Sequence, residues 1–356
     1  MYSWQKEELA NIRMSFSAAD MGTSGISSKQ LSAECRLTKT QKTILPQTIQ
    51  AGTAVSLTAG TYTIPPFILG SYEIENGIMR ITAFDKTADG DITFTDDSGY
   101  YEQYETVGGK VKYDKDGSPV IKYYHGTDVL SDACSRIGLG APAVQGLPDL
   151  SRSEFVGKSV RSILTDFSKC AAGVFSCDSD SLRLAPFQNP QGSMSAEDED
   201  HSVIKYLGNR QITKLYVTDG TNNITHVYGS GQWYNAYSTE SPYLIGETIC
   251  ENTAGKIVGR TYTGWRCENV IIDGVLPSVG YLFNGDHIIL DGEIRFGALS
   301  ITASIGAPAV QQSAADFENE EKRAIDGKIS ANEKYGYCFI DQNSGFNIYY
   351  ETEDVP

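Results

Sequence analysis

Apolar and polar residues alternate in short runs over the first third of the chain. In "YEIENGIMRITAF" (72–84), the alternation continues on both sides of the Asn76-Gly77 pair. Such alternation places successive side chains on opposite faces of a strand, and Asn-Gly is a common hairpin turn. The positions that can share one face are Tyr72, Ile74, Met79, Ile81 and Ala83. Similar runs from Lys29 to about Phe94 predict a small antiparallel sheet or barrel.

Residues 91–124 are more polar than the runs before them and contain two turn signals. Gly108-Gly109 and Asp116-Gly117 are both pairs that favour tight turns. We interpret this segment as a hairpin extension, which is an insertion or arm.

The spacing then changes to that of helices. "TDVLSDACSRIGLG" predicts a helix capped by Thr127 and stopped at Gly138. A second helix is predicted from the cap Ser159 to Gly173, with an apolar stripe at Val160, Ile163, Leu164, Phe167 and Ala171. The strands "GVFSC" and "SLRLAPF" follow, joined by a tight turn at residues 178–181. This middle portion is therefore predicted to be a small α/β domain.

Residues 189–202, "NPQGSMSAEDEDHS", form a polar and acidic stretch that is typical of a linker. The chain after it again reads as strands and turns, similar in scale to the first β region, although no internal repeat is visible by residue identity. Residues 310–328 are charged and helix-prone, and "YGYCFID" and "FNIYYE" can form a closing hairpin.

The pattern as a whole predicts a mainly β fold with a small α/β part, of the α+β class. Two small antiparallel β-barrel domains flank an α/β domain, and a C-terminal appendage follows. The predicted segments are an N-terminal arm (1–28), a first barrel with its hairpin extension (29–124), an α/β domain ending in the acidic linker (125–202), a second barrel (203–309), and a C-terminal helix and hairpin (310–356).

Length and charge narrow the class of protein. A chain of 356 residues with 40% hydrophobic content is expected to form two or three domains. The net charge of −16 disfavours specific nucleic-acid binding, although DNA could slide past such a surface. No apolar run approaches the roughly 18–20 residues needed to cross a bilayer. The start, "MYSWQKEELANIRMSF", lacks the layout of a signal peptide, so we expect no membrane insertion and synthesis in a bacterial-type cytoplasm without export.

The cysteines are odd in number and contain no C-x-x-C pair. Several have apolar neighbours, where a thiol behaves as a small hydrophobic side chain. We expect reduced, buried thiols at Cys35, Cys134, Cys170, Cys177, Cys250, Cys267 and Cys338.

Motifs that carry catalysis were sought and not found. The sequence has no phosphate-binding loop, no G-x-S-x-G, no H-E-x-x-H, and no G-x-G-x-x-G after a strand. Its histidines, His125, His201, His226 and His287, fall in separate segments. Asp286 and His287 are adjacent, and adjacent residues of a strand point to opposite faces, so this carboxylate cannot easily orient that imidazole.

The acidic stretches are better explained as solvated turns and linkers than as metal sites. "DKDGS" (114–118) resembles the start of a calcium loop but lacks the glutamate that completes one. The run Glu197, Asp198, Glu199 and Asp200 would lose entropy on closing around an ion. We therefore predict no catalytic, cofactor-binding or metal-binding residues, no cofactor, and no enzymatic activity. The sequon at residues 223–225 is not expected to be used, because no secretion signal precedes it.

Two aromatic clusters can be interpreted either as binding surfaces or as core residues. Trp233-Tyr234 with Tyr237, and Tyr262 with Trp265, could form a sugar-binding platform or an interface. Alternatively, they are core residues that cover the ends of the barrels.

The order of elements resembles the tail-associated baseplate hub proteins of phages, prophages and related contractile injection particles. The pieces that carry the resemblance are the strand end "RITAFDK" (80–86), the unit of helix, "AAG", strand, D-turn and "LRL", and the strand "NGDHIIL" (284–290) with its glycine-led return strand. The resemblance extends from about residue 31 to 306.

This resemblance implies a structural role at the tip of a tail. The chain would form a homotrimeric ring in which each copy supplies two similar barrels, and an acidic lumen would let DNA and tape-measure protein pass. Its partners would be the tail tube or distal tail protein, the tape-measure protein, and spike or fibre proteins. It would reside in the virion tail after assembly in the bacterial host cytoplasm. The alternative is a cell-wall-directed hydrolase or carbohydrate-binding module of the tail tip; the absence of a long C-terminal extension favours the structural role.

Overall fold

The computed structural model describes residues 4, 6–18, 21–59, 62–196, 203–272, 274–297, 300–309, 319–320 and 322–324. Most of the predicted C-terminal helix and hairpin (310–356) lies outside the described residues, as do the acidic run at 197–200, His201 and Cys338. None of the described helices combines the length and the apolar character needed to cross a bilayer.

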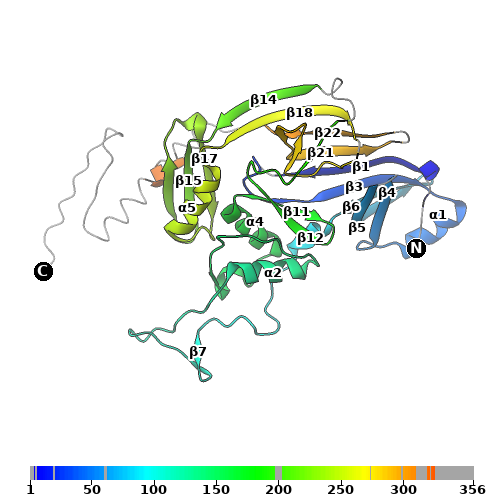
Figure 1. The fold of residues 1–356 in the computed structure, drawn as a ribbon. Helices are drawn as coiled ribbons and strands as arrows, with labels where there is room; N and C mark the ends of the chain where they lie inside the picture. The colour runs from blue at the N-terminus through cyan, green and yellow to red at the C-terminus, as the bar shows by residue number, and fades with distance from the viewer. Residues whose placement is uncertain are drawn as a thin grey trace.

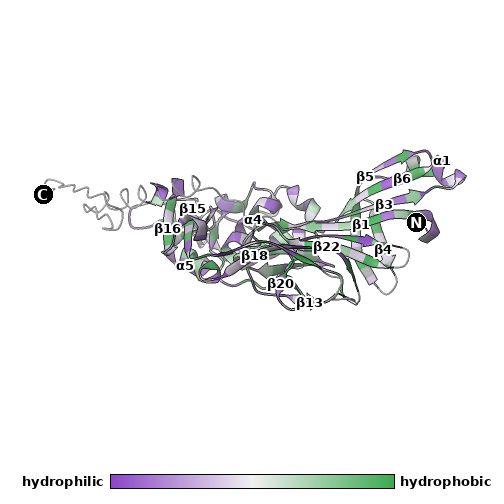
Figure 2. Cartoon of the chain, turned by 90° about the horizontal axis from the view of Figure 1, so that it is seen from above, coloured by the Kyte–Doolittle hydropathy of each residue, from purple (hydrophilic) through white to green (hydrophobic). Residues whose placement is uncertain are grey.

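A nine-stranded antiparallel sheet is the largest element of the structure (Figure 1). Its strand order is β14-β18-β22-β21-β1-β3-β6-β5-β4. The strands are β14 (Ile204–Gln211), β18 (Thr261–Ile271), β22 (Ile301–Ala307), β21 (Asp291–Phe296), β1 (Leu9–Ser17), β3 (Lys29–Arg36), β6 (Ile78–Phe84), β5 (Tyr62–Glu75) and β4 (Ala54–Ala59). Figure 2 shows this sheet from above, with β3, β5 and β6 toward one end of the molecule and α5 and β15 toward the other.

The predicted mainly β class is confirmed, but the two predicted barrels are not what the structure contains. Strands of both predicted β regions lie in one sheet, joined where Met14 of β1 pairs with Ile294 of β21. The described part of the chain includes no closed barrel. Alternation identifies strands and their two faces but carries no information on which distant strands become neighbours, which is why the sequence did not predict this joining.

The N-terminal residues are also placed differently from the prediction. The segment 9–17 was predicted to belong to the N-terminal arm (1–28). It forms β1, which lies within the sheet between β3 and β21. Met14 and Phe16 of this strand are buried, so β1 contributes to the core. The remaining domain boundaries stay predictions.

Smaller sheets and most of the helices lie below the large sheet and at one of its ends (Figure 1). Three small sheets have the orders β12-β11-β2, β16-β15-β17 and β13-β19-β20. Their strands are β2 (Ile26–Ser27), β11 (Gly173–Asp178), β12 (Ser181–Pro186), β13 (Gly192–Met194), β15 (Lys214–Asp219), β16 (Ile224–Gly229), β17 (Ala236–Ser241), β19 (Tyr281–Phe283) and β20 (His287–Ile288). The remaining strands are β7 (Thr106–Val107), β8 (Lys110–Val111), β9 (Tyr123–Tyr124) and β10 (Leu150–Ser151).

Both predicted helices of the middle portion are present. The first is α2 (Gly126–Arg136), which begins one residue before the predicted cap Thr127. The second is α4 (Val160–Ala171), where the Ser159 hydroxyl accepts the N–H of Ser162 as an N-cap. The hairpin of β11 and β12 follows α4 as predicted.

Other helical segments were not predicted. They are α1 (Lys39–Thr48), α3 (Arg152–Phe155), α5 (Gly246–Ile257), and the 3₁₀ turns η1 (Lys6–Glu8), η2 (Lys86–Asp91) and η4 (Trp233–Asn235). The segment that contains α5 was expected to be all strand and turn, whereas α5 packs against β15 and α4.

The hydrophobic core is divided into a large part and a small part. The large cluster connects the sheet to α2, α4 and α5, with Trp265, Phe167 and Phe175 among its fully buried side chains. A separate cluster lies between β3, β5, β6 and α1, and includes Cys35 and Leu45. The end of the sheet near β4 therefore has its own small core.

Candidate interaction surfaces

His287 contacts two aromatic side chains of the large sheet. Its Nε2 is 3.1 Å from the hydroxyl oxygen of Tyr206 on β14, and its ring packs edge-on against Trp265 at a centroid distance of 5.2 Å. The buried Nδ1 atom has no hydrogen-bond partner within the described residues. The predicted turn before this strand is confirmed, because Asn284 and Gly285 have φ values of 48° and 84°.

Asp114 and His125, two other candidate ligands, make hydrogen bonds with nearby residues. The Asp114 carboxylate accepts the backbone N–H groups of Asp116 and Ser118, each at 2.9 Å. His125 lies 3.0 Å from Asp149, and this hydrogen bond raises the pKa of the imidazole. In the described residues, no group of three or more His, Cys, Asp or Glu side chains could hold a metal ion.

The cysteines that the structure describes are free and buried, as the sequence predicted. Burial in apolar surroundings raises the pKa of the Cys35 thiol to about 11 and that of Cys134 to about 12. Thiols with such pKa values are almost entirely protonated near neutral pH and react slowly.

The two aromatic clusters differ in their exposure to solvent. Tyr262 and Trp265 are buried core residues, and the Trp265 indole N–H donates to the Ile288 carbonyl. Trp233 and Tyr234 are 45% and 53% exposed and pack edge-to-face with ring centroids 5.8 Å apart. Only this second pair remains available as a surface for a ligand.

A projecting segment of residues 95–125, here called the arm, is the most exposed part of the described chain (Figure 1). It corresponds to the predicted hairpin extension and contains the small β7–β8 hairpin. Three short stretches are tied together by backbone hydrogen bonds: Glu105 to Val120, Lys112 to Glu105, and Val120 to Lys112. The arm is therefore an ordered unit with its own ladder of hydrogen bonds.

Several large apolar side chains of the arm are exposed to solvent. Val107 is 69% exposed and Tyr113 is 62% exposed. The other exposed large side chains of the arm are Tyr100, Val111, Ile121 and Tyr123. Apolar side chains left in solvent on a projecting segment make it a candidate surface for binding another protein.

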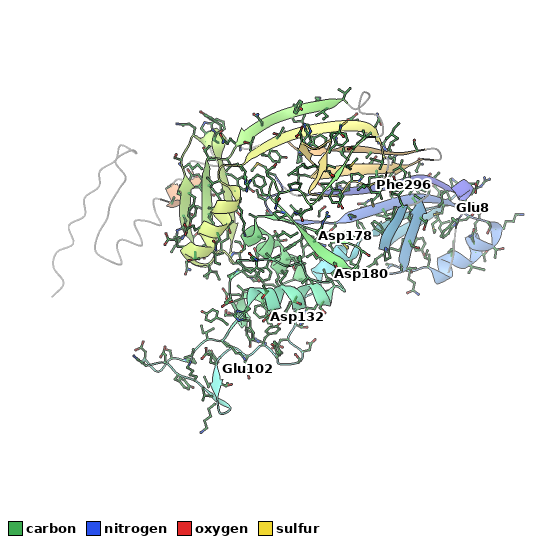
Figure 3. All side chains as sticks on the ribbon, viewed as in Figure 1. Glu8, Glu102, Asp132, Asp178, Asp180 and Phe296 are labelled. Atoms are coloured by element: carbon green, nitrogen blue, oxygen red, sulfur yellow. The ribbon has the colours of Figure 1, made fainter. Side chains whose placement is uncertain are left out.

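An aromatic cluster anchors the base of the arm to the body. The Tyr101 ring packs edge-on against Tyr124 and Phe155, at centroid distances of 4.9 and 4.8 Å. Its hydroxyl donates to Asp132 of α2 at 3.0 Å, and burial together with this bond raises the pKa of Tyr101. Asp132 and Glu102, which lies near the base of the arm, are labelled in Figure 3. These contacts fix the direction in which the arm leaves the body.

An apolar cavity of about 680 Å³ lies next to β4, among the strands of the sheet near α1. Its lining comes from β1, β3, β4, β5 and β6, and includes Trp4, Leu9, Ile12, Cys35, Val55, Leu57, Leu69 and Met79. Val55 and Leu57 of β4 are only half-buried. The sequence predicted strands in this region but not a cavity among them.

Both edges of the nine-stranded sheet are unpaired within the described residues. These edges are β4 and β14. β14 is exposed along most of its length, and Tyr206 is 62% exposed, with Leu207 and Val203 also exposed. Unpaired strand edges with apolar side chains are templates for pairing with another chain.

Neither a protein-family model nor a curated protein matches the sequence. Among solved structures, the chain is similar to a 43 kDa tail protein of prophage MuSo2 from Shewanella oneidensis, with 12% identity, a TM-score of 0.47, and coverage of 83% of this chain and 93% of that one. It is also similar to a tail protein from Neisseria meningitidis MC58, with 9% identity, a TM-score of 0.47, and coverage of 84% and 92%.

A third similar structure is an Escherichia coli protein described as a component of the type VI secretion system that resembles T4 bacteriophage tail proteins. It has 8% identity and a TM-score of 0.37, and the alignment covers 85% of this chain and 74% of that one. Phage tail proteins, which the sequence was seen to resemble, are thus found again among the solved structures.

Proposed function

We propose that this chain is a structural component of a phage or phage-like tail and forms the trimeric hub that joins the tail tube to the spike or fibre machinery. It would act by assembly and not by catalysis. Its partners would be two further copies of itself, a tail tube or distal tail protein, and the tape-measure protein. Its place would be the tail-tip baseplate of the virion, after assembly in the host cytoplasm.

The observation that carries this proposal is that, within the described residues, the edge strands β4 and β14 of the large sheet have no strand on their outer sides. β14 is exposed on both faces and keeps apolar side chains such as Tyr206 and Leu207 in solvent. An isolated soluble protein usually protects such an edge with charges, bulges or a covering element. Subunit contacts in a ring would cover both edges at once.

Two further observations support a structural role. His287, which was considered as a catalytic base, hydrogen-bonds Tyr206 and packs against Trp265. The net charge of −16 suits a lumen through which DNA passes without adhering.

Light scattering of the purified full chain tests the proposal. We expect a mass three times that of the chain at micromolar concentration, because burial of the two sheet edges and the arm favours association. A mass of one chain at every concentration up to about 100 μM would contradict the trimeric hub.

A glycan-binding role at the tail tip is the second candidate, and the exposed Trp233-Tyr234 pair is what favours it. Aromatic faces stack on the apolar faces of sugars. If this role holds, the protein sediments with purified peptidoglycan, and Trp233→Ala lowers the bound fraction several-fold, whereas Tyr123→Ala on the arm leaves it unchanged. Equal binding by both variants, or no binding by the parent protein, excludes a glycan site at this pair.

A further inference from the structure

A row of polar side chains crosses one face of the small sheet β12-β11-β2. Ser27 of β2 lies opposite Ser176 of β11, and Ser176 lies opposite Arg183 of β12. Opposite residues of neighbouring strands share a face, so these three side chains are neighbours. Ser27 and Ser176 are each 1% exposed. The two serines of the row are therefore fully removed from solvent.

Three polar atoms of this row have no hydrogen-bond partner within the described residues. They are the hydroxyl oxygens of Ser27 and Ser176 and the Nε atom of Arg183. Buried polar groups in folded proteins nearly always have a partner, because an unpaired group loses its hydrogen bonds to water without replacement. Three such atoms on adjacent residues point to a ligand that accepts hydrogen bonds from all of them.

The loop before β19 covers this face of the small sheet. A Cβ at Gly280 would lie 2.5 Å from the Cβ of Ala185, which shares the face of β12 with Arg183. The Nη2 group of Arg183 donates to the Ser278 hydroxyl at 3.3 Å and to the Val279 carbonyl at 3.1 Å. These bonds hold the guanidinium against the loop, so the donors of the row have fixed positions.

A second cationic group lies beside the row. The Lys29 ammonium donates to the carbonyl of Cys177, the residue after Ser176, at 2.9 Å. Burial lowers the pKa of Lys29, Asp85 opposes this shift, and the positive charge of Arg183 adds to it. Lys29 and Arg183 are therefore close enough to repel each other.

The nearby carboxylates are engaged elsewhere. Asp85 accepts the backbone N–H groups of Lys29 at 2.8 Å and of Thr87 at 3.1 Å. Asp178, labelled in Figure 3, is exposed at the end of β11, where water screens its charge. Of the charged groups that act on Lys29, the two cations thus face a single buried carboxylate. One positive charge is left without a buried counterion.

We propose that a small monovalent anion of the halide type binds between Ser27, Ser176 and Arg183. It accepts from both hydroxyls and from the Nε–H group, and it has no hydrogens that would need acceptors of their own. A metal cation does not suit these groups, because a guanidinium has no lone pair to offer. The site is independent of the proposed role in a tail. It would tie the small sheet to the large one, since β2 leads directly into β3.

Crystals of the full chain grown with sodium bromide test the site directly, because bromide gives an anomalous X-ray signal and water does not. We expect an anomalous peak in contact with both serine hydroxyls and with the Arg183 Nε atom. The absence of a peak there, or density without an anomalous signal, would overturn the proposal. In the second case, water would be the acceptor.

Thermal unfolding in solution checks that the anion binds at ordinary concentrations. The full chain is unfolded in sodium chloride at about 0.15 M and in sodium gluconate of the same ionic strength, which removes general screening effects. We expect a midpoint about 2 °C or more higher in chloride, because a ligand that binds only the folded state stabilises it. Equal midpoints alongside a bromide peak would mean an adventitious ion only, and the proposal would fail.

Variants of the row locate the effect of chloride. Ser176→Ala removes one donor and should abolish the difference in midpoint between the two salts; Ser27→Ala repeats the test from β2. Each change removes a buried hydroxyl that has no partner, so the fold should be kept, which circular dichroism checks. The matched control is Ser179→Ala, an exposed change in the turn of the same hairpin, which should keep the difference.

If Ser176→Ala and Ser27→Ala keep the full difference between the salts, chloride acts elsewhere and the proposal is wrong. The same conclusion follows if Ser179→Ala abolishes it as well. None of these measurements uses the mass of the assembly, so the anion site and the trimeric hub can each fail without the other.

Discussion

Asp166 is a buried carboxylate on the inner face of α4. Its Oδ1 accepts a hydrogen bond from the Ser241 hydroxyl at 2.9 Å. Burial raises the pKa of Asp166, and the nearby Lys158 and Lys169 offset this only in part. The folded state therefore holds the proton of Asp166 more tightly than the unfolded state does.

This pKa shift predicts a pH dependence of stability with a definite sign. The unfolding free energy should fall as the pH rises from the ordinary value of 3.8 through the raised pKa of Asp166, because the unfolded chain loses its proton first. Asp166→Asn keeps an acceptor for Ser241 and removes the buried charge. We expect the variant to be more stable than the parent at pH 7 and to lose this part of the pH slope, as measured by urea unfolding from pH 4 to 8.

The control for this prediction is Asp116→Asn, an exposed change at the turn of the arm. It should leave the unfolding free energy within about 0.5 kcal/mol of the parent value, as surface substitutions generally do. If Asp166→Asn is destabilising at pH 7, the hydrogen bonding of the charged carboxylate outweighs its desolvation.

At the residue scale, the sequence predicted local chemistry well. The Asn284-Gly285 turn and the Ser159 cap follow from short-range rules for turns and helix ends. The burial of Tyr262 and Trp265 and the exposure of Trp233 and Tyr234 were left open. Both pairs have similar composition, and only tertiary packing decides which is covered.

At the scale of elements, the helices show where sequence patterns succeed and fail. α4 was predicted because it combines a cap, an apolar stripe and a stop. α1 carried a usable signal that was missed: the Thr38 hydroxyl accepts the N–H of Gln41, and the Gln41 side chain accepts the N–H of Thr38, which is a capping box. α5 begins at Gly246 without a side-chain cap, so no comparable signal marks its start.

The prediction of two separate barrels was wrong because of the way that strands pair. The hairpin of β5 and β6 was recognised because alternation is local, and the two strands pair across the predicted Asn76-Gly77 turn. The pairing of β1 with β21 joins distant residues, such as Arg13 and Arg295, which are 282 positions apart. Neither local propensity nor turn chemistry specifies contacts of this kind. The arm was predicted as a hairpin, but its role as an apolar surface emerged only from the exposure of its side chains.

At the scale of the whole molecule, net charge and apolar surface act in opposite directions on association. Each chain carries a formal charge of −16, so copies that approach one another repel. The surfaces proposed for contact include the edge strands β4 and β14, where Val55 and Leu57 are half-buried and Tyr206 is exposed. The attraction there is apolar and gains little from charge.

This balance predicts that salt strengthens the assembly. Raising the ionic strength from about 0.01 M to about 0.15 M shortens the Debye length from about 30 Å to about 8 Å, which screens the repulsion between chains and leaves apolar contacts intact. The dissociation constant measured by sedimentation should therefore fall several-fold over this range. Sucrose at equal osmotic strength serves as the control and should have a smaller effect. Dissociation on adding salt would mean that complementary charges hold the copies together. Apolar contacts would then not be the main attraction between copies.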